Sequence, residues 1–192
     1  MSINGAKLLA LGAALLFSGS MAAAADKLSS GDQRFIKDAA GGGMMEVQLG
    51  KLAAEKASSP QVKEFGRKME QDHSKANAEL QKLASTKNVQ IPHELEGKQK
   101  STYDRLAKLS GDRFDREYMK AMIDDHKDDV DKFKKEAEKA NDPDVKSFAS
   151  KTLPTLEQHL EMAQSTGQQV GATSESGLKG LIDKTKDKIK RQ

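Results

Sequence analysis

Apolar residues recur at helical spacing along most of the chain, whereas the alternating pattern of β-strands is almost absent. Stripes with a period near 3.6 residues run through four segments, about 32–57, 60–86, 112–140 and 143–166. Ala, Lys, Glu, Asp, Leu and Gln dominate these segments, and β-branched residues are few. The pattern therefore predicts an all-α protein with four long amphipathic helices.

Two predicted turns are nearly identical in sequence. The first is A-S-S-P-Q-V-K-E-F around Pro60, and the second is A-N-D-P-D-V-K-S-F around Pro143. Ser59 and Asp142 are suited to cap the following helices, and each precedes a proline at the first helical position. The two turns predict two helical hairpins that are halves of an internal repeat, offset by 83 residues.

The segment 87–111 belongs to neither hairpin. Pro92 and Gly97 interrupt it, and S-T-Y-D-R-L-A-K-L at 101–109 predicts a short helix. Two hairpins joined by a long crossover form one of the standard topologies of four-helix bundles.

Both ends of the chain differ from its body. Residues 1–25 have one charge, Lys7, then an apolar run and small residues, a layout that predicts a signal peptide and export to the periplasm. Residues 26–31 are a short linker, and the bundle is expected over 32–166. We interpret 167–177 as a flexible linker and 178–192 as a basic amphipathic tail. That tail is suited to peripheral contact with anionic lipid or an acidic partner, or it is simply a solvated helix.

Composition narrows the function classes. The chain has no cysteine, which excludes disulfides, thiolate metal sites and cysteine nucleophiles. Its net charge is only +3, acids and bases are interleaved, and aromatic residues make up 4%, so we expect no nucleic-acid partner. No P-loop, G-x-S-x-G or H-E-x-x-H motif is present, which favours a binding role over an enzymatic one.

Each predicted long helix interrupts its apolar stripe with a group that binds protons or metals. These groups are Glu46, His73, His126 and His159. Glu46 lies 14 residues before Pro60 and His73 lies 13 after it, so the two should face each other across the first hairpin. His126 and His159 should face each other likewise across the second. If the two turns lie at opposite ends of a bundle ~40–45 Å long, the two levels coincide.

Three histidines and a glutamate in a bundle core suit one transition-metal ion, iron, zinc or copper. Asp72 and Tyr118 are further candidate metal-site residues. Glu70-x-x-His73 matches half of a di-iron motif, but the repeat has Leu156 where the second histidine would stand. The alternative is a purely structural layer of buried hydrogen bonds.

Two nearby features leave alternatives open. Met69, Met122 and Met162 lie one helical turn from the three histidines, a pattern that suits copper but also ordinary core packing. Gly41-Gly42-Gly43 precedes Glu46, and it predicts either a break in the first helix or a close approach of its backbone to a neighbour.

Three stretches carry a resemblance to a known family. They are 49–80 with Asp72-His73, F-D-R-E-Y-M-K-A-M-I-D-D-H at 114–126, and T-L-P-T-L-E-Q-H-L-E-M-A at 152–163. They resemble the bacterial family called domain of unknown function 4142. The resemblance implies an exported, ferritin-like four-helix bundle, often labelled an outer-membrane or stress-related protein. The family-marking positions fall on Glu46, Asp72, His73, Asp115, Tyr118, His126 and His159.

The leading hypothesis is thus a periplasmic ferritin-like bundle that binds a metal ion and serves metal handling or envelope stress protection. An alternative is a non-enzymatic envelope interaction protein whose polar layer fixes helix register and whose tail contacts membrane or partner. A redox-active metalloenzyme is a third hypothesis, and it requires an open coordination position.

Overall fold

The computed structural model describes residues 28–172, and within that range the only regular structure is α-helix. The helices are α1 (Ser30–Lys56), α2 (Pro60–Thr86), α3 (Gly97–Ala107), α4 (Gly111–Lys139) and α5 (Pro143–Gln169). The all-α prediction is confirmed. Helix α5 continues to Gln169, so the first three residues of the predicted linker are helical, and Pro154 lies within this helix.

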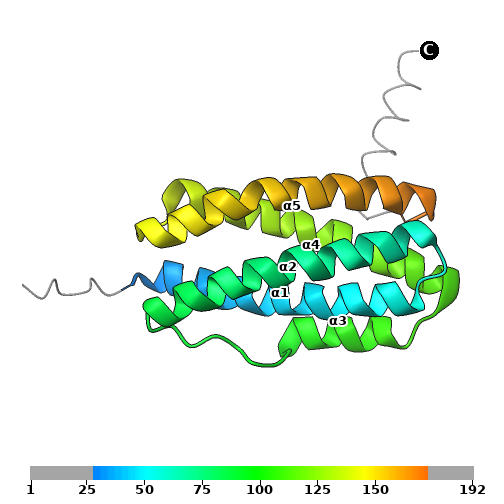
Figure 1. Cartoon of the computed structure of the whole chain (residues 1–192), viewed down its shortest axis with the longest axis horizontal. Helices are drawn as coiled ribbons and strands as arrows, with labels where there is room; N and C mark the ends of the chain where they lie inside the picture. The colour runs from blue at the N-terminus through cyan, green and yellow to red at the C-terminus, as the bar shows by residue number, and fades with distance from the viewer. Residues whose placement is uncertain (1–27, 173–192) are drawn as a thin grey trace, which may run out of the picture.

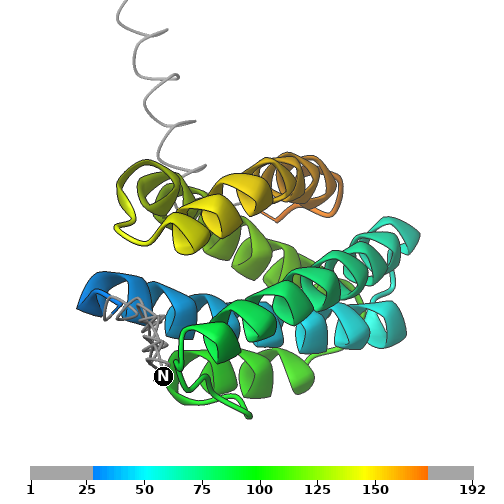
Figure 2. The ribbon, with the colours of Figure 1, turned by 60° about the vertical axis from the view of Figure 1, so that its left-hand side comes forward.

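The four long helices form a bundle of two antiparallel hairpins, α1–α2 and α4–α5 (Figure 1). Helix α2 packs on α5, and α1 packs on α4. The α1–α2 turn and the α4–α5 turn lie at opposite ends of the bundle, because the crossover between hairpins runs back along its length (Figure 1). Helix α3 lies within that crossover, against the outer side of α1 and away from α5 (Figure 2). The predicted four-helix bundle with a crossover helix is therefore confirmed.

The two predicted proline turns have the expected caps. The Ser59 hydroxyl accepts a hydrogen bond from the Val62 backbone N–H, and the Asp142 carboxylate accepts one from the Val145 backbone N–H. Helices α2 and α5 both begin with the proline that follows the cap. A proline at this position loses no hydrogen bond, since the first N–H groups of a helix have no partner within it.

Each turn is also held by a buried acid from the other hairpin. The Asp115 carboxylate on α4 accepts the backbone N–H groups of the two residues before Pro60. The Asp32 carboxylate on α1 accepts those of the two residues before Pro143. These contacts obey the 83-residue offset, so the internal repeat extends from sequence to the bonds that join the hairpins.

Buried apolar side chains form two clusters, and each draws on all four long helices. One lies toward the α1–α2 turn and includes Leu49, Phe65, Met122 and Ala163. The other lies toward the α4–α5 turn and includes Phe35, Leu80, Phe133 and Phe148. On α2, α4 and α5 a buried histidine falls between the residues of the two clusters. The polar groups predicted at mid-bundle therefore divide the core.

Glycines set the spacing of α1 and α2. A Cβ added at Gly50 would lie 2.6 Å from the Gly66 carbonyl oxygen, and one at Gly66 would lie 2.7 Å from the Gly50 carbonyl oxygen. The backbones of the two helices touch there. Helix α1 is unbroken through residues 41–43, and a Cβ at Gly43 would meet the Asn77 side chain at 2.1 Å. The close approach, rather than a helix break, is the correct alternative.

Between residues 28 and 172, the helices carry too much charge, or are too short, for any of them to cross a membrane. The predicted signal peptide and basic tail, residues 1–25 and 178–192, lie outside the described residues.

Candidate metal centre

Three histidines from three helices meet at the centre of the bundle. His73 of α2, His126 of α4 and His159 of α5 are 6%, 0% and 1% exposed. Their ring centres lie 5.2–5.6 Å apart in all three pairs. One ring nitrogen of each lies within 4.8 Å of a ring nitrogen of each of the others. The predicted coincidence of the two hairpin levels is confirmed, because both turns lie at opposite ends.

One nitrogen of each ring is engaged by an acceptor at the edge of the cluster. His73 Nδ1 lies 2.8 Å from Glu46 Oε2, and His159 Nε2 lies 2.8 Å from Asp72 Oδ2. His126 Nδ1 lies 3.0 Å from the backbone carbonyl oxygen of Met122. A carbonyl oxygen only accepts, so His126 Nδ1 carries the hydrogen and its Nε2 presents a lone pair. Ionised Glu46 and Asp72 impose the same order on the other two rings.

The second nitrogen of each ring has no hydrogen-bond partner. These atoms are His73 Nε2, His126 Nε2 and His159 Nδ1, and all three are buried. His126 Nε2 is 3.3 Å from Glu46 Oε1, but the angles do not make a hydrogen bond. Buried polar atoms rarely remain without a partner. Three such atoms in one cluster therefore indicate a site for a ligand that accepts lone pairs.

The spacing of the rings fits a metal ion. An ion about 2.0–2.1 Å from a ring nitrogen lies about 3.2 Å from that ring's centre. Three such rings have centres about 5.2 Å apart in tetrahedral geometry and about 5.5 Å apart in trigonal geometry. The observed separations are 5.6, 5.2 and 5.4 Å. The rings thus stand where three imidazole ligands of one ion would stand.

Burial keeps these imidazoles neutral, the form that binds metal. It lowers the pKa of His73, His126 and His159 to about 4. Burial also raises the pKa of Glu46 to about 8, although His126 opposes this shift. Burial opposes ionisation of Asp72 as well, but hydrogen bonds from Lys68 and His159 hold its pKa below the usual value. The layer has one acid that ionises readily and one that needs a nearby positive charge.

The structure places the other predicted site residues around this cluster. Asp72 is partly buried and contacts His159 and Lys68 through the same oxygen, Oδ2. Tyr118 is fully buried and stacks on Phe114, with ring centres 5.5 Å apart, and its hydroxyl makes no hydrogen bond. Burial, together with the charge of Glu46, raises the pKa of Tyr118 well above its usual value.

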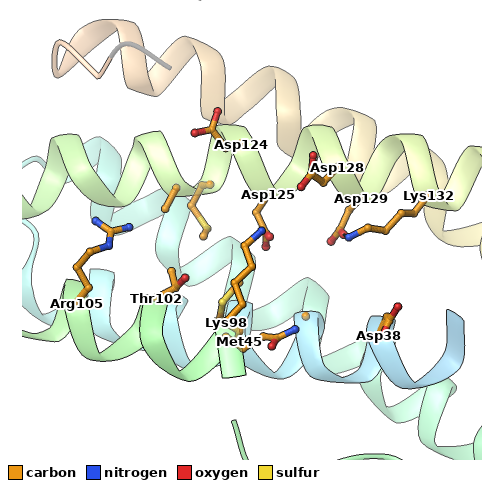
Figure 3. Close-up of a pocket in the computed structure, with 14 residues that line it drawn as sticks. Asp38, Met45, Lys98, Thr102, Arg105, Asp124, Asp125, Asp128, Asp129 and Lys132 are labelled. Atoms are coloured by element: carbon orange, nitrogen blue, oxygen red, sulfur yellow. The ribbon is translucent and has the colours of Figure 1, made fainter. Parts of the chain in front are cut away.

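Two acids beside the histidines were not predicted. Asp125 and Asp129 of α4 each bring a carboxylate oxygen within 4.8 Å of one from Glu46. They line a pocket of about 440 Å³ between α1, α3 and α4 (Figure 3). Their run, D-D-H-K-D-D at 124–129, has the composition of an exposed helix face, which hid them. The repeat offset was the available clue, because Asp129 is the equivalent of Glu46.

Burial raises the pKa of both new acids. The pKa of Asp125 rises to about 8, with the charges of Glu46 and Asp129 adding to the effect of burial. That of Asp129 also rises, and Lys132, whose Nζ is 3.3 Å from Asp129 Oδ1, opposes the shift. The three acids therefore share a region where several negative charges are unfavourable without a cation.

Comparison of folds finds similar helical bundles among solved structures. A DUF305 fragment from Deinococcus radiodurans is 12% identical, with a TM-score of 0.63 over 73% of this chain and 98% of that chain. CopM in its Cu(I)-bound form is 18% identical, with a TM-score of 0.60 over 72% and 96%. CopM in its Ag-bound form is 19% identical, with a TM-score of 0.59 over the same shares. At these identities the likeness shows the fold.

Comparison of sequences identifies the family. The model of the domain of unknown function DUF4142 matches residues 18–166, so the chain belongs to the DUF4142 family. Among proteins with curated descriptions, none matches this chain.

Proposed function

We propose that this DUF4142 protein binds one transition-metal ion through His73, His126 and His159, and that its role is metal handling in the periplasm. The observation that carries the proposal is the convergence of three buried ring nitrogens without hydrogen bonds. Each of the three rings is held by an acceptor on its other nitrogen, an arrangement typical of metal-ligating histidines.

Copper is the ion that this ligand set and the fold comparison favour first. Imidazole nitrogen suits copper and zinc, whereas a calcium or magnesium site would need oxygen ligands. The CopM structures that share this fold are copper-bound and silver-bound forms. Glu46 Oε1, 3.3 Å from His126 Nε2, stands beside the three nitrogens as a fourth ligand or as a counter-charge.

The burial of the site suits holding an ion rather than turning over a substrate. All three histidines are buried, and the two apolar clusters close the layer on both sides along the bundle. An ion there is shielded from solvent and from oxidants, which is how a copper-handling or envelope stress-protection protein would keep it unreactive.

Titration with Cu(I) and Zn(II) against a competing chelator tests the proposal directly. The protein is prepared without an affinity tag, beside His73→Ala, His126→Ala and His159→Ala. We expect one ion per chain and an affinity at least about 100-fold weaker in each variant, because one of three ligands is lost. The matched control is His93→Ala, since His93 is the chain's fourth histidine and is exposed outside the cluster. Equal affinities in all four variants would contradict the proposal.

Replacing Asp72 separates a metal centre from a structural polar layer. In Asp72→Asn, the weaker acceptor no longer fixes the His159 tautomer, so we expect metal affinity to fall about 10–100-fold. The metal-loaded wild-type protein should also melt at a higher temperature than the metal-free protein, as linkage requires. A melting temperature that metal leaves unchanged would instead favour the structural layer that fixes helix register.

A further inference from the structure

The three acids beside the histidine cluster form a geometrically distinct group. Glu46 comes from α1, whereas Asp125 and Asp129 lie one turn apart on α4. Carboxylate oxygens from the three residues lie within 4.8 Å of one another. None of the three nitrogen atoms of the histidine cluster is needed to describe this group, although Glu46 contacts both sets.

The group contains oxygens that lack partners. Glu46 is 1% exposed, and its Oε1 makes no hydrogen bond. Asp125 Oδ2 is likewise buried without a hydrogen bond. Desolvated carboxylate oxygens are costly unless hydrogen bonds or a cation compensate them. The unpartnered oxygen of Glu46, next to that of Asp125, therefore indicates a positively charged ligand.

Nearby lysines compensate this charge only in part. Lys132 approaches Asp129, with 3.3 Å between Nζ and Oδ1. Lys98 extends from α3 toward Asp125 (Figure 3), yet Asp125 Oδ2 still has no hydrogen bond. The pocket wall also carries Asp38, Asp124 and Asp128, so acids outnumber bases around it. A cation entering from solvent meets a negative surface before it reaches the three acids.

We propose that Glu46, Asp125 and Asp129 form a second cation site, one that takes a hard divalent ion such as Mn²⁺ through carboxylate oxygens. Its opening is the pocket between α1, α3 and α4, and waters from that pocket complete the coordination shell, as hard divalent ions require. The site goes beyond the proposed function, because its ligands are oxygens and its ion differs in class from copper. Glu46 is the residue common to both sites.

The repeat explains why the acids meet. Glu46 and Asp129 occupy equivalent positions, 83 residues apart, on two helices that pack against each other. Asp125 adds a third oxygen from one turn earlier on α4, where the first hairpin has Gly42. A Cβ at Gly42 would meet nothing within 4 Å, so the pocket in front of the acids stays open.

Manganese binding, followed by the electron paramagnetic resonance signal of free Mn²⁺ at about 0.15 M salt, tests this site, since such salt screens diffuse binding. We expect one Mn²⁺ per chain, and at least about tenfold weaker binding in Asp125→Asn and Asp129→Asn. Asp124→Asn and Asp128→Asn are matched controls, because both residues line the same pocket on the same helix but are exposed. Their affinity should equal that of the wild-type protein.

Two results would overturn the proposal. One is no Mn²⁺ binding up to millimolar concentration, and the other is an equal loss in the variants of exposed and partly buried aspartates. Both are distinguishable from failure of the histidine site. A protein that binds Cu(I) but not Mn²⁺ lacks only the carboxylate site, whereas one that binds Mn²⁺ but neither Cu(I) nor Zn(II) lacks only the histidine site. Misfolding is checked by the melting temperature, which Asp125→Asn should not lower, because it replaces an acid that lacks a hydrogen bond on Oδ2.

Discussion

The α1–α2 and α4–α5 hairpins match at their ends and diverge at mid-bundle. Both have a capped proline turn, and both turns are held by an acid from the opposite hairpin. At the centre the equivalent pairs are Glu46 and Asp129, His73 and Leu156, Gly43 and His126, and Ala76 and His159. Only the acids correspond. The ends therefore carry the requirements of folding, which both halves share, and the centre carries residues that packing alone does not demand.

The hairpins also differ in how closely their helices approach. In the first hairpin Gly50 and Gly66 let two backbones touch. In the second hairpin their equivalents are Phe133 and Ala149, and both are buried. The first pair is thus set by backbone contact and the second by a side chain of large volume. The same repeat tolerates two spacings because each is filled.

The largest stability effect should come from filling the glycine contact. Gly66→Ala would place its Cβ 2.7 Å from the Gly50 carbonyl oxygen, so two helices must move apart. We expect a loss of about 3 kcal/mol in the free energy of unfolding, measured by chemical denaturation. The control is Gly42→Ala, which meets no atom within 4 Å and should gain up to about 1 kcal/mol. Equal effects of the two variants would disprove backbone contact as the cause.

The next largest effect tests how alike the hairpin ends are. Asp32→Ala and Asp115→Ala each remove a buried carboxylate that accepts two backbone N–H groups. Each variant should lose about 2–3 kcal/mol of unfolding free energy, and the two losses should agree within about 0.5 kcal/mol. Asp115→Asn retains one acceptor oxygen and should lose about half as much. A large difference between the two alanine variants would show that the repeat is equivalent in sequence only.

The smallest effect concerns the residues that end α2 and α5. Asn88 and Gly171 are equivalent and have φ values of +54° and +71°. Gly171→Ala should cost about 1 kcal/mol in the free energy of unfolding, because a Cβ disfavours positive φ and no close contact adds to the strain. Gly171→Asn should cost less, since asparagine tolerates this conformation. An asparagine variant as unstable as the alanine variant would mean that side-chain size, not φ, sets the cost.

The fold was largely predictable because local chemistry and the repeat agree. Helical periodicity located all four long helices, and the two proline turns fixed the hairpins. Equal distances from those turns brought Glu46 opposite His73, and the structure places the corresponding atoms 2.8 Å apart. The coincidence of the two levels depended on topology, which no local pattern encodes.

Parts of the site were beyond sequence reasoning for physical reasons. Asp125 and Asp129 lie in a run of charged residues that a solvated helix would also have, and only the approach of α1 brings Glu46 to them. The two turn-holding acids, Asp32 and Asp115, bond to backbone groups more than 50 residues away. Partners at such distances in sequence leave no periodic trace.

The division of the core into two apolar clusters has a mechanical consequence. Each cluster needs all four long helices, so neither hairpin holds a complete hydrophobic interior, and the clusters are joined across a plane of polar atoms. That plane is a seam along which the two ends of the bundle are least bound to each other. An ion seated there would act as a rivet, converting two regions that breathe separately into one cooperative unit.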